Sequence, residues 1–227
     1  MNWHHHITQF YHSLQLPDLP TGVQSLLPFS EDPVAKVFRA FYTKFYNDSN
    51  QRRLIIGINP GRFGGGVTGI PFTDPIRLAH DCGIANNFQQ RQELSSLYMY
   101  QMIDAYGGPR AFYNQFYFTS YSPVGFTKNG KNLNYYDDKI LATAIEPFAA
   151  SCLQEQLSWN VDRDIAYCLG DGKNFQYVSK LNKKYGFLKQ VIPLSHPRFI
   201  MQYKLKQKED YIAKYLRAFS GVENQML

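Results

Sequence analysis

Four short apolar segments of the chain have the length and composition of buried β-strands. They cover residues 54–58, 116–121, 165–169 and 190–194. Each is rich in aliphatic or aromatic side chains, and turn-forming or small polar residues follow it closely, as expected for a strand. We therefore predict a central sheet of about four strands.

Elsewhere, apolar residues recur at the spacing of amphipathic helices. The predicted helices cover residues 7–16, 33–46, 75–82, 95–106, a short segment from Pro109, 138–159, 172–184 and 203–219. Pro147 lies inside one of them and lacks the N–H that a helix interior needs, which predicts a kink or a break there. Residues 128–138 are polar and are predicted to form a loop.

The predicted strands and helices alternate along the chain, which indicates an α/β fold with a mainly parallel sheet and helices on both faces. The chain has 227 residues, of which 44% are hydrophobic, and no linker-like stretch divides it. We expect one domain over residues 1–227, with residues 1–50 as a helical N-terminal extension packed on it. In such sheets ligands bind outside the carboxyl ends of the strands. Asn59, Ser120, Gly170 and His196 lie at those ends.

Cysteine and histidine usage argues against a metal site and against a disulfide framework. Cys82, Cys152 and Cys168 are odd in number and widely separated, so they are expected to be ordinary buried thiols. The run of three histidines from His4 to His6 is interpreted as incidental. No segment approaches the ~18 apolar residues of a membrane span, and the first residues lack the features of a signal peptide. We expect a cytoplasmic protein without a metal or an organic cofactor.

The positive charge of the chain is concentrated near its C-terminal end. Residues 173–217 contain eleven Lys and Arg against two acidic residues, a local balance of +9, whereas the rest of the chain carries −3. A basic segment on an otherwise slightly acidic protein is typical of a polyanion-binding protein. A lysine-rich helix face that is merely solvated is the alternative.

A glycine-rich loop follows the first strand and contains six glycines between residues 57 and 69. Such a run can continue the strand neither as strand nor as helix, and its backbone can come very close to a ligand. Asn59, Arg62 and Phe72 project from it. The sequence thus predicts a pocket for a flat, polar molecule at this loop.

Two nucleotide-binding motifs fit the loop poorly. Gly64, Gly66 and Gly69 match the dinucleotide fingerprint G-x-G-x-x-G, but they lie well past the strand and lead into a second proline instead of a helix. The phosphate-binding P-loop is excluded because Val67 stands where that motif needs a lysine. A nucleotide-dependent enzyme is therefore the least favoured interpretation.

Residues 57–72, with the sequence GINPGRFGGGVTGIPF, closely resemble the uracil-DNA glycosylase superfamily, in its single-strand-selective monofunctional branch. That branch carries a G-x-N-P-G-x-F-G loop, a T-G-x-P-F segment and an H-P motif near the C-terminal end. The segments SPVGF, GKNL and SHPR follow in this chain in the same order. The resemblance covers roughly residues 54–204, and it implies a three-layer α/β/α fold.

The resemblance also implies roles for individual residues. Asn59 matches the residue that orients the attacking water, and His196 matches the donor to the 2-position oxygen of the departing base. Phe72 matches the ring on which the flipped base stacks. The backbone amides near Ile58 and Gly61 are further candidate donors.

Two departures from the family pattern affect base and DNA recognition. Where the family has an Asn that reads the Watson–Crick edge of the base, this chain has Ser120, whose hydroxyl cannot supply an amide's paired donor and acceptor. In the H-P motif, Arg198 follows the proline directly, so the wedge that fills the gap left by the flipped base is built differently. Its candidates are Arg198, Phe199 and Met201.

The sequence therefore predicts a monofunctional DNA glycosylase of base excision repair, monomeric and without a cofactor, that hydrolyses the N-glycosidic bond of uracil or a related deaminated or oxidised base. Arg62, Arg198, Phe199, Met201 and Lys204 are expected to contact DNA. No lysine stands in the matched motifs to form a Schiff base, so no strand cleavage is expected. A non-catalytic nucleic-acid-binding relative is the main alternative.

Overall fold

Four parallel strands form the central sheet in the spatial order β3-β2-β6-β7. They are β2 (Arg53–Gly57), β3 (Phe116–Ser120), β6 (Ile165–Leu169) and β7 (Gln190–Leu194), in a computed structural model that describes residues 1–30 and 32–221. Each strand lies within one residue of a predicted segment. Four of the five residues of β2, and of β6, are buried, since both strands are flanked by other strands and covered on both faces.

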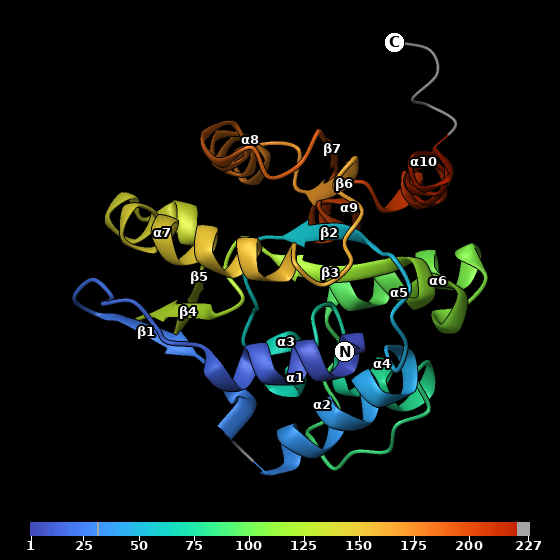
Figure 1. The fold of residues 1–227 in the computed structure, drawn as a ribbon. Helices are drawn as coiled ribbons and strands as arrows, with labels where there is room; N and C mark the ends of the chain where they lie inside the picture. The colour runs from blue at the N-terminus through green and yellow to red at the C-terminus, as the bar shows by residue number, and fades with distance from the viewer. Residues whose placement is uncertain (31, 222–227) are drawn as a thin grey trace.

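Helices cover both faces of this sheet (Figure 1). α7 (Lys139–Gln156) and α8 (Lys173–Tyr185) lie on one side, and α5 (Leu94–Tyr106), α6 (Pro109–Gln115) and α10 (Lys208–Ser220) lie on the other. The side chains of β3 alternate between the two layers: the ring centroid of Tyr117 is 5.9 Å from that of Trp159, just after α7, and Phe116 is 4.7 Å from Phe219 of α10. The three-layer α/β/α fold is confirmed.

The N-terminal segment packs through aromatic side chains. α1 (Trp3–Ser13) buries Trp3, whose ring lies 5.3 Å from that of Tyr117, and α2 (Asp32–Phe45) buries Phe41 against Tyr113 at 5.1 Å. Arg52 is fully buried between the rings of Trp3 and Tyr46, at 5.1 and 4.7 Å. Its guanidinium donates to both carboxylate oxygens of Asp48, at 2.8 and 2.9 Å. This packing joins the first fifty residues to the sheet.

A second, antiparallel sheet was not predicted. It consists of β1 (Val23–Leu26), β4 (Gly125–Lys128) and β5 (Lys131–Leu133), in the order β1-β4-β5. The expectation of an irregular loop over residues 128–138 was therefore wrong. These strands are three or four residues long, and β1 and β5 are partly exposed, so the sequence shows no apolar run there, and only pairing between distant segments stabilises the sheet. They position the polar segment that follows β5.

Three helices also differ from the expectations. α7 runs through Pro147 without interruption, since the buried residues on both sides of it outweigh the loss of one N–H bond. The basic helix predicted over residues 203–219 begins at Lys208 as α10, the 3₁₀ turn η3 (Leu205–Gln207) precedes it, and the short helix α9 (Pro197–Tyr203) was not predicted. The glycine loop contains one helical turn, α3 (Gly65–Thr68), and is followed by α4 (Pro75–His80). Two 3₁₀ turns complete the description, η1 (Pro28–Ser30) and η2 (Tyr135–Asp137).

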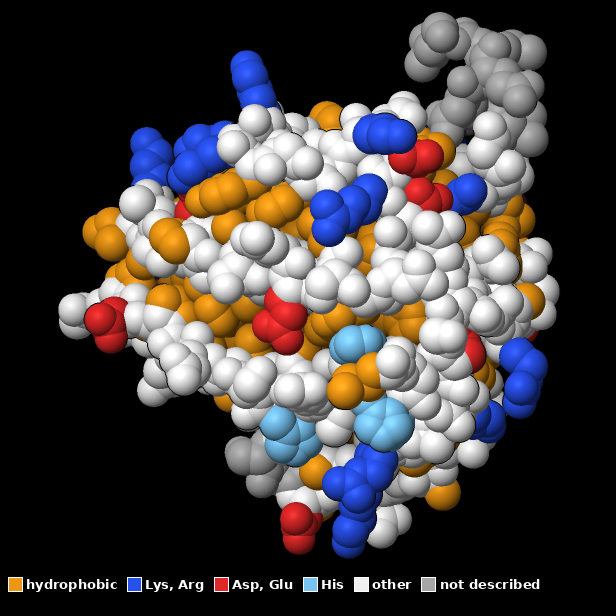
Figure 2. Space-filling view, viewed as in Figure 1, with side chains coloured by type: hydrophobic (Ala, Val, Ile, Leu, Met, Phe, Trp, Pro, Cys, Tyr) orange, Lys and Arg blue, Asp and Glu red, His pale blue; other side chains and the backbone are white. Residues whose placement is uncertain are grey.

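The surface view shows Lys and Arg side chains gathered over α8 (Figure 2). Salt bridges balance part of this charge: Lys180 and Lys184 pair with Glu146 of α7, at 3.4 and 2.7 Å. Within residues 1–30 and 32–221, no helix is both long enough and apolar enough to cross a membrane.

Replacing Trp3 by Ala tests whether the N-terminal segment is part of one cooperative domain. Trp3 is 1% exposed, so its loss should lower the free energy of unfolding by about 3–5 kcal/mol while leaving a single transition. Chemical denaturation followed by circular dichroism measures both quantities. Ile140→Ala, at a site that is 71% exposed, should change stability by less than about 0.5 kcal/mol. A two-step transition in the Trp3 variant would show a separate unit.

Candidate active site

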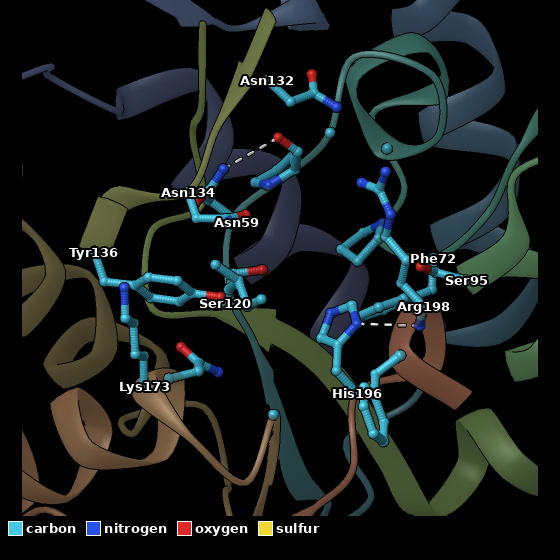
Figure 3. Close-up of a pocket in the computed structure, with 18 of the residues that line it drawn as sticks. Asn59, Phe72, Ser95, Ser120, Asn132, Asn134, Tyr136, Lys173, His196 and Arg198 are labelled. Carbon is cyan, nitrogen blue, oxygen red and sulfur yellow. Dashed lines mark hydrogen bonds between the residues drawn. The ribbon is translucent and has the colours of Figure 1, made fainter. Parts of the chain in front are cut away.

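A pocket of about 490 Å³ lies outside the carboxyl ends of the central strands (Figure 3). Figure 3 shows Tyr136 and Lys173 on one side, Phe72, His196 and Arg198 on the other, and Asn59 and Ser120 between them. Eight of the residues predicted for the site line it, namely Ile58, Asn59, Gly61, Phe72, Ser120, His196, Arg198 and Phe199. They come from the ends of β2, β3 and β7 and from the segments that follow, which the parallel topology brings to one edge.

The side chain of Asn59 is held by the backbone of the segment after β5. Its Nδ2 donates to the carbonyl of Leu133 at 3.2 Å, and its Oδ1 accepts from the N–H of Tyr135 at 3.0 Å. A backbone carbonyl can only accept and a backbone N–H can only donate, so these two bonds fix the orientation of the amide. One lone pair of Oδ1 remains for a molecule in the pocket.

Phe72 adopts a backbone conformation that the loop imposes. Its φ of 54° lies in the left-handed region, which costs a residue with a side chain about 1–2 kcal/mol. The adjacent Thr73 is fully buried, and its carbonyl accepts from the Thr68 hydroxyl at 2.7 Å. The Phe72 ring packs on Phe118 of β3, with centroids 5.2 Å apart, and lies 6.3 Å from the ring of His196. A flat aromatic surface thereby forms one wall of the pocket.

Close packing at the end of β2 brings Phe72 and Ser120 together. Gly57 pairs with Ser120 in the parallel register, and a Cβ atom at Gly57 would lie 3.2 Å from the Phe72 ring and 3.4 Å from the Ser120 hydroxyl. A larger residue at position 57 would push both away. The short side chain of Ser120 leaves the space in front of it open, where an amide would extend further into the pocket.

His196 caps α9 with its own ring: Nδ1 accepts from the backbone N–H of Arg198 at 3.1 Å. Burial, together with the neighbouring Arg198 and against an opposing effect of Asp171, lowers the pKa of His196 to about 4. The ring is therefore neutral at pH 7, and with Nδ1 as acceptor its proton is on Nε2. Figure 3 shows this second nitrogen on the side of Ser120, so His196 presents one N–H donor to the pocket.

The loop before His196 is tied to the end of the neighbouring strand. The Ser195 hydroxyl donates to the carboxylate of Asp171 at 2.8 Å, and the Tyr215 hydroxyl donates to the Ser195 carbonyl. Asn174, which lines the pocket, donates to the carbonyl of Leu169 at 2.9 Å. These bonds position the imidazole before any ligand arrives.

Glu93 is a pocket residue that sequence analysis missed. Its carboxylate accepts from the Ser96 hydroxyl at 2.9 Å and lies against Gly64, filling the space that a Cβ there would need. Burial raises the pKa of Glu93, and Asp74 adds to the rise, while Ser96 and Arg198 oppose it. Glu93 belongs to no motif or periodic pattern. It is far from the glycines in the sequence, and only the fold brings it against them.

Other lining residues were also missed, chiefly Asn132, Asn134, Tyr136, Lys173, Gln202 and Tyr203. Asn132 belongs to the quoted GKNL segment, and its Oδ1 accepts from the Arg62 N–H at 3.1 Å. Lys173 follows β6, so the rule that ligands bind at strand ends was a signal for it. The 63%-exposed Lys173 side chain lies 3.9 Å from Asp137, and its ammonium is 5.7 Å from the Tyr136 ring.

Three predicted DNA-contacting residues lie outside the pocket lining. Arg62 is exposed, and its guanidinium donates to the carbonyl of Gly130 and lies 4.5 Å from the Phe63 ring. Met201 is half-buried against the hydrophobic core, while Lys204 follows the last residue of α9. Among the described residues, no group of three or more His, Cys, Asp or Glu is placed to hold a metal ion.

Fold and site together correspond to one class of protein. The sequence profile of the uracil DNA glycosylase superfamily matches residues 43–220, and the chain belongs to this superfamily. Within it, the chain is of the SMUG type: it is similar to the crystal structure of wild-type SMUG2 from Pedobacter heparinus, with a TM-score of 0.95 and 44% sequence identity over 99% of each chain. The likeness thus also includes the first fifty residues, which the motif comparison left out. No curated protein sequence matches.

The neutral state of His196 predicts a specific pH behaviour. Since the folded pKa is below the usual 6.5, the folded protein should bind its proton only near pH 4, and lowering the pH from about 6.5 should cost stability because the unfolded chain protonates first. NMR titration of the His196 ring proton signals measures this pKa directly. A His196 midpoint near 6.5 would contradict the lowered pKa.

Proposed function

We propose that this protein is a monofunctional DNA glycosylase of base excision repair, which hydrolyses the N-glycosidic bond of uracil or a related deaminated or oxidised base after the nucleotide has flipped out of the stack. The observation that carries the proposal is the convergence of Phe72, Asn59 and a neutral His196 on one pocket. Stacking surface, water-orienting amide and leaving-group donor are the three parts that such a reaction requires.

In the proposed reaction the bond between C1′ and the base nitrogen breaks, and the base leaves with the electron pair. The Nε2–H of His196 donates to the base oxygen on which negative charge develops, a contact worth about 2.7–4 kcal/mol in a preorganised site. The free lone pair of Asn59 Oδ1 orients a water that forms the new bond to C1′. An amide is too weak a base to keep the water's proton, so the departing base anion or solvent accepts it.

Lys173 is the lysine to consider as a nucleophile for strand cleavage. A Schiff-base lysine needs a desolvated amine, or a second cation beside it, to become neutral. Lys173 is 63% exposed and faces Asp137 instead. This supports the monofunctional assignment, in which the abasic product keeps its backbone until alkali cleaves it.

The two alternative functions are less consistent with the site. A purely nucleic-acid-binding relative would not need both Asn59 and His196 held by dedicated hydrogen bonds. A nucleotide-dependent enzyme would place phosphate against the glycine loop, where the carboxylate of Glu93 lies against Gly64 and would repel it. The helical turn α3 has four residues, shorter than the helix that follows the dinucleotide fingerprint.

Asn59→Ala and His196→Ala should each lower single-turnover excision by at least about tenfold, with little change in DNA affinity, because both contacts act in the transition state. The measurement uses an oligonucleotide with one uracil, treated with alkali after incubation to reveal abasic sites. His80→Ala, at an exposed position away from the pocket, is the matched control. Unchanged excision in both pocket variants would refute the proposed mechanism.

Ser120 is expected to broaden the range of bases. Because its hydroxyl leaves room and supplies no amide pair, Ser120→Asn should raise uracil excision relative to 5-hydroxymethyluracil, hypoxanthine and xanthine, by at most about 1–3 kcal/mol in transition-state free energy. Excision rates on four matched oligonucleotides measure this ranking. Ser120→Ala removes the hydroxyl without adding an amide and serves as control. If the ranking is identical in wild type and both variants, Ser120 does not face the base.

A further inference from the structure

The segment after His196 carries an unusual amount of exposed apolar surface. Of the eight large hydrophobic side chains that are exposed among the described residues, three fall between residues 199 and 205. Phe199 is 41% exposed, Tyr203 is 71% exposed and Leu205 is 57% exposed. A cluster of this kind beside a pocket marks a contact surface for a ligand.

Phe199 and Tyr203 form one surface because they are four residues apart on α9 and therefore share a helix face. Their ring centroids are 5.6 Å apart, with 41° between the planes. Both line the pocket, and α9 begins directly after His196. The aromatic pair is thus continuous with the mouth of the base pocket.

The fold does not need this face. The core side of α9 is formed by Pro197 and Ile200, which are buried, and by Met201, which is half-buried against the core. The aromatic pair is on the other side and lies at the rim of the pocket. Its removal should leave the helix packed as before, which makes a ligand the better explanation for two exposed rings.

The charge around the pair indicates the kind of ligand. Arg198, Lys204 and Lys206 alternate with the aromatic residues, and within the described part of the chain none of them forms a salt bridge. Aromatic rings interleaved with cations are the composition of tracks that bind single-stranded nucleic acid, where bases stack on rings and phosphates pair with cations. A protein partner with an apolar surface would leave these cations without a role in binding.

We propose that the Phe199–Tyr203 pair is a stacking platform for the base next to the target nucleotide on the same strand. Arg198, Lys204 and Lys206 contact the phosphates on either side of that base. A base paired in a duplex is already stacked and cannot reach the platform, so an unpaired neighbour strengthens binding. The inference rests on the proposed function only in that the target base occupies the adjoining pocket.

The test is a mutant cycle between Tyr203 and the neighbouring base. Binding is measured with single-stranded oligonucleotides that carry a 2′-fluoro-2′-deoxyuridine, which resists excision, flanked on each side in turn by a normal base or by a tetrahydrofuran residue without a base. Tyr203→Ala should weaken binding of the fully based oligonucleotide by about tenfold, the loss expected for one base stack. Tyr203→Phe keeps the ring and should bind like wild type.

Removing the neighbouring base on one side should weaken oligonucleotide binding by the wild type to a similar extent. The same removal should not weaken binding by Tyr203→Ala any further. Tyr185→Ala, which removes a 41%-exposed tyrosine of α8, should change nothing. Circular dichroism melting checks that all variants are folded.

Three outcomes would overturn the inference: an equal loss in Tyr203→Ala whether or not the neighbouring base is present, no loss at all, or a loss confined to duplex DNA, which would make the pair a wedge. Excision of uracil is measured separately on cleavable oligonucleotides. Absence of excision by the wild type, with the coupling intact, would refute the proposed function and leave the platform standing.

Discussion

The site depends on the parallel pairing of β2 between β3 and β6. Parallel strands end at the same edge, so the residues after β2, β3, β6 and β7 meet there although they are far apart in the chain. Gly57 pairs with Ser120, and a Cβ at Gly57 would press on the Phe72 ring. The register between β2 and β3, together with the lack of a side chain at Gly57, therefore sets the distance between Phe72 and Ser120.

The side chains of Asn59 and His196, which face the pocket, are held by hydrogen bonds to backbone groups and not by ion pairs. Asn59 is fixed between Leu133 and Tyr135, and the ring of His196 accepts from Arg198. Burial keeps His196 neutral, which leaves a donor of known position and no fixed positive charge. Groups that need no rearrangement when charge develops are the most effective form of electrostatic stabilisation. The small antiparallel sheet contributes here, because β5 leads directly into the segment that orients Asn59.

Acidic and basic side chains lie at different parts of the pocket rim. Beneath the glycine loop, Glu93 disfavours phosphate, whereas Arg198, Lys204 and Lys206 surround the exposed rings of α9. In the function proposed above, this arrangement would direct a polyanion along α9, past the mouth of the pocket, instead of into the loop. Much of the remaining basic segment pairs with acidic side chains, as Lys180 and Lys184 do with Glu146. The total charge of the segment therefore overstates the surface that is available to DNA.

By itself, the sequence determined the four central strands, the α/β class and the residues at the strand ends, because apolar runs and glycine-rich turns are local signals. Motif order also identified Asn59, Phe72 and His196. Tertiary structure alone decided the second sheet, whose short strands form only by long-range pairing, and the separate helix α9 before α10. It also decided that Glu93, Tyr136 and Tyr203 line the pocket. Packing between distant segments brings these side chains to the site, and no local pattern records such contacts.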